Sequence, residues 1–354
     1  MLALERDHEV DEDAGGDDQR IQHEHRSHGA DASGPLGRLY TRPVALYLTE
    51  SDVESLLGPH DALETIEACC RRMAAGAVEN LPRARLRLDR GAMRVMAAAD
   101  LELGYAGVKT YAAFGYDDVR FVVVLFRSAA PAELVAVIDA NRLGQLRTGA
   151  ASGVAARYLA RPDARTLGVI GCGWQAESQV ACIRAAVPTI ERAVAYCRTE
   201  ERLRAFCERV GAEPTESHRE AGEQDVVVTV TTSRDPVLRG EWLRPGALVC
   251  AVGANDRGAR ELDNVVLERA SFVCCDSLEQ AKIESGDLIE PVEGGVLDWL
   301  EVHELHEVVG GDVTGRHSPD DIVVFKSNGI AAWDVAAGAA ALERARDAGL
   351  GREL

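Results

Sequence analysis

The hydrophobic and polar positions of this 354-residue chain follow two patterns, which meet near residue 148. Before that point, short runs rich in apolar residues come close together, and in Arg83–Leu88 arginines alternate with apolar residues, as is typical of an antiparallel sheet. Helical patterns at Ser51–Leu57 and Asp61–Ala77 precede these runs. The predicted strands are Arg83–Leu88, Val95–Ala99, Tyr105–Tyr111, Phe121–Phe126 and Glu133–Ile138.

Beyond residue 148 the apolar runs are separated by helical stretches. Such runs are typical of parallel strands that are buried on both faces, so they predict a doubly wound α/β sheet. A helix of small residues, Gly149–Leu159, opens this region, and an alanine-rich helix, Ile330–Ala348, follows it. The predicted strands are Leu167–Ile170, Ala193–Cys197, Asp225–Val230, Ala247–Gly253, Ser271–Cys275 and Asp321–Phe325.

A glycine-rich turn joins the first of these strands to the next helix, and it reads Gly171-Cys172-Gly173-Trp174-Gln175-Ala176. Gly171 permits a tight turn, Gly173 lets the backbone approach a pyrophosphate, and Ala176 keeps the helix close to the strand. The N-terminus of the helix offers free N–H groups to phosphates. A strand precedes the turn, and a helix and a second strand follow it. We therefore predict a dinucleotide-binding βαβ unit rather than an ordinary strand-to-helix turn.

The end of the second strand, Cys197-Arg198-Thr199, bears on which dinucleotide is bound. Sites selective for NAD usually place an acidic residue here, where it accepts from the ribose 2′-hydroxyl. Arg198 can instead neutralise a 2′-phosphate, and Thr199 can donate to one, which favours NADPH over NADH. In a second interpretation, which is compatible with the first, Thr199 is the N-cap of the next helix.

The net charge of −19 argues against nucleic acid or an anionic membrane as a partner. No stretch reaches the roughly 20 apolar residues that span a bilayer, and no cationic start followed by an apolar run indicates a secretory signal. Residues 1–38 are polar and acidic, and we expect them to form a disordered tail. Nine cysteines without a Cys-x-x-Cys pair predict buried thiols in a reducing cytoplasm, with no metal site.

Only three of the 39 basic residues are lysines, namely Lys109, Lys282 and Lys326. In a chain that prefers arginine so strongly, a lysine is present for its specific chemistry more often than in an average protein. Chance retention is an equally good explanation for each of the three lysines.

An ordered series of motifs resembles the ornithine cyclodeaminase/mu-crystallin family over residues 39–354. The motifs are Leu81-Pro82-Arg83, Gly107-Val108-Lys109, Leu146–Ala151, Gly171–Ala176, Thr229–Thr232, Ala251–Asn255, Arg260–Asp263 and Phe325–Gly329. The resemblance implies a homodimer of two-domain subunits in which the last helix returns to the first domain. A discontinuous α+β domain for substrate binding and dimerisation would hold residues 39–148 and 325–354, and a Rossmann domain would hold residues 149–324.

Members of that family act on α-amino or α-imino acids, whose carboxylate must be held while a hydride moves at Cα. Arg83, Lys109 and Arg147 are the cations that match the family pattern. Guanidinium groups bind a carboxylate in bidentate fashion, and Lys109 could also move a proton if its pKa is lowered. Arg83 could instead be one of several solvent-facing strand arginines, with Arg85 in its role, and Arg147 an ordinary residue of a helix N-terminus.

The resemblance to the family also assigns further residues to the cofactor site, in addition to the glycine turn, Arg198 and Thr199. The added residues are Thr148, Thr231, Thr232, Val252, Gly253, Lys326 and Ser327.

One position departs from the cyclodeaminase pattern. Those enzymes carry an aspartate in a Gly-x-Asp turn, where it meets the side-chain amine of ornithine, whereas this chain has Asn255 after Gly253-Ala254. An amide neither accepts that proton nor pairs with an ammonium. Asp256 lies next to it, but a shift of one residue redirects a side chain in a tight turn. Asn328 also stands where the family often has a small aliphatic residue.

We therefore expect an NAD(P)H-dependent reductase or dehydrogenase that transfers hydride at Cα of a small imino or amino acid. Arg83, Lys109 and Arg147 would hold the carboxylate, and Lys109, or a water positioned by Asn255 or Asp256, would deliver a proton. The alternative is an ornithine or lysine cyclodeaminase that uses NAD+ catalytically and releases ammonia. A third hypothesis is a nucleotide-binding protein without catalysis.

Overall fold

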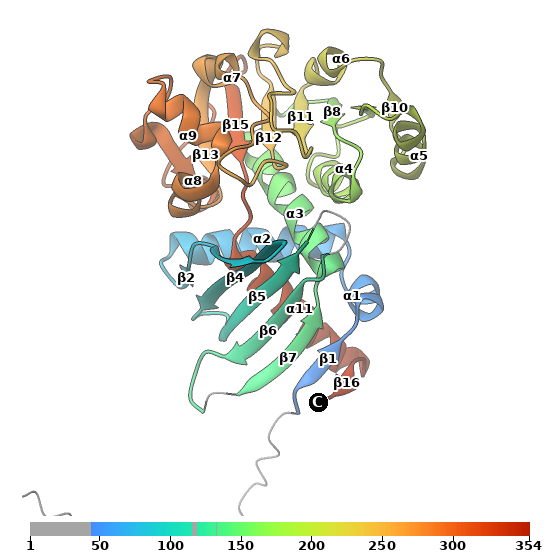
Figure 1. Cartoon of the computed structure of the whole chain (residues 1–354), viewed down its shortest axis with the longest axis vertical. Coiled ribbons are helices and arrows are strands. Elements are labelled where there is room, and N and C mark those ends of the chain that lie inside the picture. The colour runs from blue at the N-terminus through green and yellow to red at the C-terminus, as the bar shows by residue number, and fades with distance from the viewer. Residues whose placement is uncertain (1–43, 115–118, 132) are drawn as a thin grey trace, which may run out of the picture. The chain divides into compact units, whose positions relative to one another are not determined.

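The computed structural model describes residues 44–114, 119–131 and 133–354 (Figure 1). The predicted acidic tail, residues 1–38, lies outside these described residues. The α-helices are α1 (Glu50–Leu56), α2 (Pro59–Ala74), α3 (Asn141–Leu159), α4 (Trp174–Ala186), α5 (Glu200–Val210), α6 (His218–Gly222), α7 (Asn264–Arg269), α8 (Leu278–Glu284), α9 (Gly286–Glu293), α10 (Leu305–Gly310) and α11 (Ala331–Ala348), with 3₁₀ turns at Gly240–Trp242 and Trp299–Glu301.

The strands form two sheets. They are β1 (Leu46–Leu48), β2 (Val78–Asn80), β3 (Ala84–Leu88), β4 (Gly91–Asp100), β5 (Tyr105–Ala113), β6 (Val122–Arg127), β7 (Leu134–Asp139), β8 (Thr166–Ile170), β9 (Arg192–Tyr196), β10 (Glu213–Pro214), β11 (Val226–Thr229), β12 (Leu248–Ala251), β13 (Ala270–Cys275), β14 (Val302–Glu304), β15 (Ile322–Lys326) and β16 (Arg352–Glu353).

The first sheet, here called the mixed sheet, has the order β16-β1-β7-β6-β5-β4-β2, and β3 pairs with β4. It is antiparallel as predicted, except that β1 runs parallel to β7. Alternation along its strands buries one face against α11, which crosses behind the strands in Figure 1. Tyr105, Val123 and Leu125 are among the buried residues of that face.

The second sheet is wholly parallel, in the order β10-β9-β8-β11-β12-β15-β13-β14. The chain runs outward from β8 through β9 to β10, and then returns to the other side of β8 at β11. In doubly wound sheets such a reversal leaves a crevice at the carboxyl ends of the strands, here β8 and β11, and ligands bind there. The prediction of a doubly wound α/β sheet is thereby confirmed.

Helix α3 begins at Asn141, eight residues before the start predicted from its small residues. It packs on α2 and α4, and it also contacts α11, β12 and β15. The predicted division of the chain at residues 148 and 325 falls inside α3 and inside β15. Because β15 pairs with β12 as far as Lys326, its last two residues belong to the parallel sheet. The domain assignment itself stays a prediction.

All nine cysteines lie within the described residues and are free thiols. None of the helices in the described ranges combines the length and the apolar character that crossing a membrane requires.

Candidate active site

The three predicted cations reach one place from three elements. Arg83 immediately precedes β3, Lys109 lies on β5, and Arg147 lies in the second turn of α3. All three side chains are buried, with no more than 7% of any of these residues exposed. Burying three positive charges together is costly unless acidic groups compensate for them.

Asp334 of α11 compensates for two of these charges. Its Oδ1 atom accepts a hydrogen bond from Lys109 Nζ and another from Arg147 Nε, both at 2.9 Å. Asp334 is fully buried, which raises the pKa of its carboxyl, but the charges of Arg147 and Lys109 outweigh burial and lower that pKa overall. Asp334 is therefore a carboxylate that holds the two cations side by side.

Arg147 keeps the outer end of its guanidinium available. Only Nε bonds to Asp334, and Nη1 is buried without a hydrogen-bond partner among the residues that the structure describes. The group lies against Gly329, where a Cβ atom would stand 2.9 Å from Nη1. Since Gly329 also has a positive φ of 81°, a side chain at this position would be strained and would push against the guanidinium.

Lys109 has an ammonium that can lose its proton near neutral pH. Its pKa is lowered to about 8, first by burial and then by the charge of Arg147, while Asp334 acts in the opposite direction. The Nζ atom also lies 4.7 Å from the centre of the Phe121 ring. A lysine with a pKa in this range can donate a proton and be recharged from solvent, as general acid–base catalysis requires.

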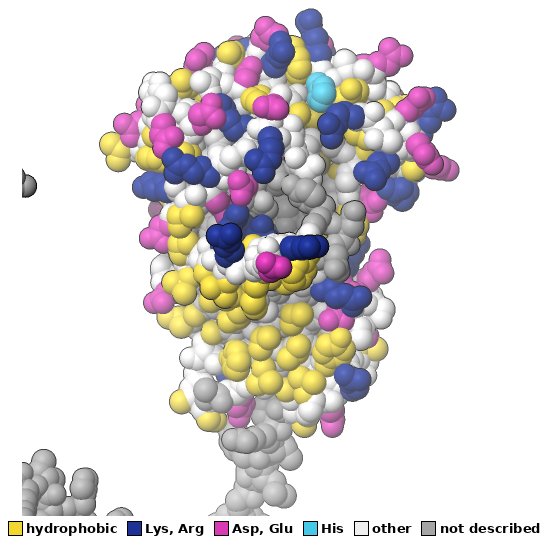
Figure 2. Space-filling model, in the orientation of Figure 1, with side chains coloured by type: hydrophobic (Ala, Val, Ile, Leu, Met, Phe, Trp, Pro, Cys, Tyr) yellow, Lys and Arg dark blue, Asp and Glu magenta, His cyan; other side chains and the backbone are white. Residues whose placement is uncertain are grey.

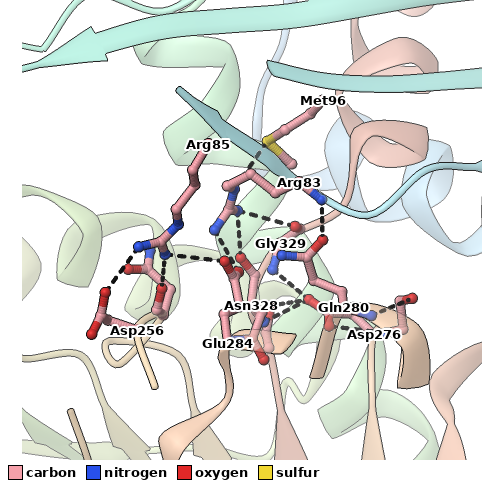
Figure 3. A network of polar contacts seen from close by, with 12 residues as sticks. Arg83, Arg85, Met96, Asp256, Asp276, Gln280, Glu284, Asn328 and Gly329 are labelled. Atoms are coloured by element: carbon pink, nitrogen blue, oxygen red, sulfur yellow. Dashed lines mark hydrogen bonds and ion pairs between the residues drawn. The ribbon is translucent and has the colours of Figure 1, made fainter. Parts of the chain in front are cut away.

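Arg83 is fixed on several sides (Figure 3). Its Nη1 donates to Oε1 of the buried Glu284 at 2.5 Å, and its Nη2 donates to the carbonyl of Asn328 at 2.8 Å. Its Nη2 also lies 3.3 Å from the carbonyl of Gly329, the residue against which Arg147 packs. The structure therefore brings Arg83, Lys109 and Arg147 together around the turn between β15 and α11.

Arg85 joins the mixed sheet to the loop after β12 (Figure 3). It donates through Nη1 to Asp256 at 2.8 Å, and through Nη2 to the carbonyl of Asn255 at 2.7 Å and to Glu284 at 3.1 Å. Asn255 and Asp256 are both exposed. Hydrogen bonds from Gly258 and Arg85 lower the pKa of Asp256, which suits a loop-positioning carboxylate better than a proton donor.

The glycine turn has the features that a dinucleotide requires. Gly171 has a φ of 111°, and a Cβ atom there would lie 2.5 Å from the carbonyl of Val230, so only glycine fits. A Cβ atom on Gly173 would meet open space instead. Gly173 is also the N-cap of α4 without a side-chain cap, so the first N–H groups of the helix face outward for an anion. Ala176 is buried in the core.

Arg198 and Thr199 lie at the carboxyl end of β9, and both are exposed. Thr199 is the N-cap of α5, but its side chain makes no capping hydrogen bond. No ion pair of Arg198 occurs among the described residues. Burial first, and then the charge of the nearby Arg198 guanidinium, lowers the pKa of His218. An exposed cation beside the crevice is compatible with the predicted contact to a 2′-phosphate.

A buried acidic cluster fixes the loops on the far side of the crevice. Oε1 of Glu261 accepts from the amide and the hydroxyl of Thr231, and Oε2 accepts from the Gly253 amide at 2.7 Å. Asp287 pairs with Lys326 at 3.0 Å, and Lys326 also donates to the carbonyl of Ala254. Thr231 and Lys326, predicted to bind cofactor, thus direct their side chains into this cluster and shape the loops that carry Val252 and Gly253.

The remaining predicted cofactor residues have different surroundings. Ser327 donates to the buried Asp276 at 2.9 Å, and the same carboxylate oxygen accepts from the Asn328 amide. Thr148 bonds back to the carbonyl of Gly144 within α3. Thr232 and Trp174 are exposed, Cys172 and Gln175 are half-buried, and the Trp174 carbonyl accepts from Gln145.

Sequence reasoning missed the acidic partners of these cations. Asp334 did carry a signal, because it is a lone acid within the alanine-rich stretch of α11. Asp276 follows β13 directly, at the carboxyl edge of the sheet. Glu284 gave no signal, since its distance from Arg83 along the chain is 201 residues and only the fold brings them together.

The chain has relatives among known proteins. The sequence profile of the ornithine cyclodeaminase/mu-crystallin family matches residues 44–349. The chain belongs to this family. A relative, alanine dehydrogenase of Archaeoglobus fulgidus, is 36% identical over 320 residues, which cover 87% of this chain and 98% of that protein.

Two solved structures of this family resemble the fold closely. One is Delta(1)-pyrroline-2-carboxylate reductase of Thermococcus litoralis in complex with NADH and L-proline, with a TM-score of 0.82, 31% identity, and coverage of 87% of this chain and 100% of that chain. The other is an archaeal alanine dehydrogenase dimer with bound NAD, with a TM-score of 0.81, 36% identity, and coverage of 88% and 98%.

Proposed function

We propose that this family member is an NAD(P)-dependent oxidoreductase that reduces a small 2-imino acid to the amino acid and catalyses the reverse oxidation. The observation that carries this proposal is the pairing of Lys109 and Arg147 on Asp334, beside Arg83, at the carboxyl edge of a dinucleotide-binding sheet. The reduced nicotinamide cofactor, held by the glycine turn and the N-terminus of α4, would supply hydride.

Each cation has a distinct part in this proposal. Nη1 of Arg147, which has no hydrogen-bond partner among the described residues, and its neighbour Nη2 match the two oxygens of the substrate carboxylate, and Arg83 adds positive charge on the other side of Gly329. Lys109 donates a proton to the substrate nitrogen as hydride reaches Cα, so the C=N bond becomes C–N and charge balances. With a pKa of about 8, Lys109 is then protonated again from solvent.

The exposed side of the mixed sheet supports the predicted homodimer. Apolar side chains gather on this face in Figure 2, over β4, β5 and β6. They point away from α11 and include Val95, Ala97, Val108, Val122, Val124 and Phe126, the last of which is 39% exposed. An apolar face of this kind on a sheet is typical of a protein–protein interface. The nine free thiols agree with a reducing compartment, so we infer a cytoplasmic enzyme.

Two assays test the activity. The first follows NADPH and NADH consumption with cyclic ketimines and with pyruvate plus ammonia or amines, and we expect consumption. The second incubates ornithine or lysine with catalytic NAD+ and measures ammonia. Ammonia release without net change in the cofactor would identify a cyclodeaminase instead, and inactivity in both assays would favour a binding protein.

A further inference from the structure

Two buried carboxamides beside Arg83 have polar atoms that lack partners. Asn328 is 5% exposed and Gln280 is 1% exposed. Both polar atoms of the Asn328 side chain, Oδ1 and Nδ2, lack a hydrogen-bond partner among the described residues, as does Nε2 of Gln280. A buried amide without hydrogen-bond partners lowers the stability of the fold unless a ligand or an ordered water forms hydrogen bonds with it. The pair therefore indicates a place prepared for a polar group.

The backbone of Asn328 fixes where this place is. Its amide donates to Asp276 at 2.7 Å, and its carbonyl accepts from Arg83 Nη2 at 2.8 Å, as Figure 3 shows. Gln280 is fixed in the same way, since its Oε1 accepts from the backbone amide of Arg83. Asn328 lies two residues after the end of β15, at the carboxyl edge of the parallel sheet, where ligands bind. The unpartnered carboxamide thus belongs to the cation cluster that holds the substrate carboxylate in our proposal.

The chemistry of the carboxamide narrows the group that it can recognise. Nδ2 only donates and Oδ1 only accepts, and both are free, so the conclusion does not depend on which way the amide is turned. A hydroxyl or a second carboxamide satisfies both atoms. A carboxylate satisfies Nδ2 and leaves Oδ1 facing another acceptor, and a hydrocarbon satisfies neither.

We propose that Asn328 makes this enzyme selective for imino and amino acids whose side chain carries a neutral hydroxyl or carboxamide. This inference rests on the proposed function, because it names the substrate class of that same site. A site that hydrogen-bonds a substrate group discriminates strongly against the analogue that lacks it.

Isosteric amino acids and the shape-matched variant N328L test the proposal. The oxidative reaction is measured with L-serine against L-2-aminobutyrate and with L-threonine against L-valine, since each pair exchanges a hydroxyl for a methyl group. For the wild-type enzyme we expect kcat/KM to favour the hydroxyl member. In N328L this preference should fall by about tenfold or more, through loss on the hydroxyl substrate and gain on the apolar one.

Stability and cofactor binding serve as controls for N328L. Since the carboxamide has no partner within the described protein, N328L should melt at or above the wild-type temperature and bind NADH normally. A lower melting temperature of N328L would show that the amide has a structural role. Weaker NADH binding by N328L, with an unchanged ratio of kcat/KM between hydroxyl and methyl substrates, would show that the amide contacts the cofactor. Either result overturns the proposal. If the enzyme is active but its preference for the hydroxyl substrate is the same in the wild type and in N328L, this inference alone is overturned. Inactivity of the wild type on every amino acid overturns the proposed function with it.

Discussion

At the scale of single residues, the proposed chemistry depends on Lys109 and Asp334. A buried lysine loses its charge easily, and the carboxylate beside it limits how far its pKa falls. This balance gives Lys109 a pKa of about 8, so the protonated and neutral forms are both accessible near physiological pH. The exposed Lys282 of α8 has no such surroundings and offers a natural control.

Replacement of Lys109 by methionine should lower kcat for reduction by roughly 10²–10⁴-fold, because the proton donor is lost. NADH binding, measured by fluorescence titration, should stay near the wild-type value, since the cofactor turn is untouched. The control K282M should keep wild-type rates. Equal rates in K109M and K282M would remove Lys109 from the mechanism.

The pH profile gives a second test of Lys109. Reduction uses the protonated form, so its rate should fall as pH rises through about 8, while the oxidation rate should rise over the same interval. In D334N the carboxylate that raises the pKa of Lys109 is gone, and the falling limb should move to lower pH. Thermal melting and NADH titration show whether D334N is folded. A folded D334N with an unshifted limb would contradict this account.

At the scale of elements, the strand ends place the cofactor groups. The turn after β8 leaves the N-terminus of α4 open, and the end of β9 carries Arg198. Strand β9 pairs with β8 in register up to Ile170 and Tyr196, so the two turns lie next to each other. We therefore propose that the first turn contacts the phosphates of the cofactor and the second contacts its adenosine ribose.

Replacement of Arg198 by alanine should weaken NADPH binding about tenfold or more and leave NADH binding nearly unchanged, because only NADPH carries a 2′-phosphate. Fluorescence titration of both cofactors measures this, with the exposed Arg202 of α5 replaced by alanine as the control. Tighter binding of NADH than NADPH by the wild-type protein would overturn the predicted preference.

At the scale of the whole molecule, the mixed sheet has two faces of different character. The face toward α11 carries Lys109 into the core, and the opposite face exposes apolar side chains, which we propose contact a second copy. Because side chains alternate along a strand, neighbouring residues such as Val108 and Lys109 lie on different faces.

Replacement of Val124 by glutamate should turn the dimer into a monomer, since it introduces a charge into the apolar face. Light scattering coupled to gel filtration gives the mass in solution. The control V265E changes a valine of α7 that is 37% exposed on the parallel-sheet side, and it should leave the mass unchanged. A V124E protein with the mass of the wild type would exclude this face as the interface.

The sequence by itself determined the two sheets and the glycine turn, because apolar runs, their spacing and turn glycines are local signals. The three cations were selected by the resemblance to the family motifs and not by a local pattern. The tertiary structure decided which acids accompany the cations. Asp334, Glu284 and Asp276 are brought in from distant elements, and no local pattern shows that Lys326 turns toward Asp287. Charge compensation in a core depends on the packing of the whole chain, so only the folded protein reveals which cations remain free for a substrate.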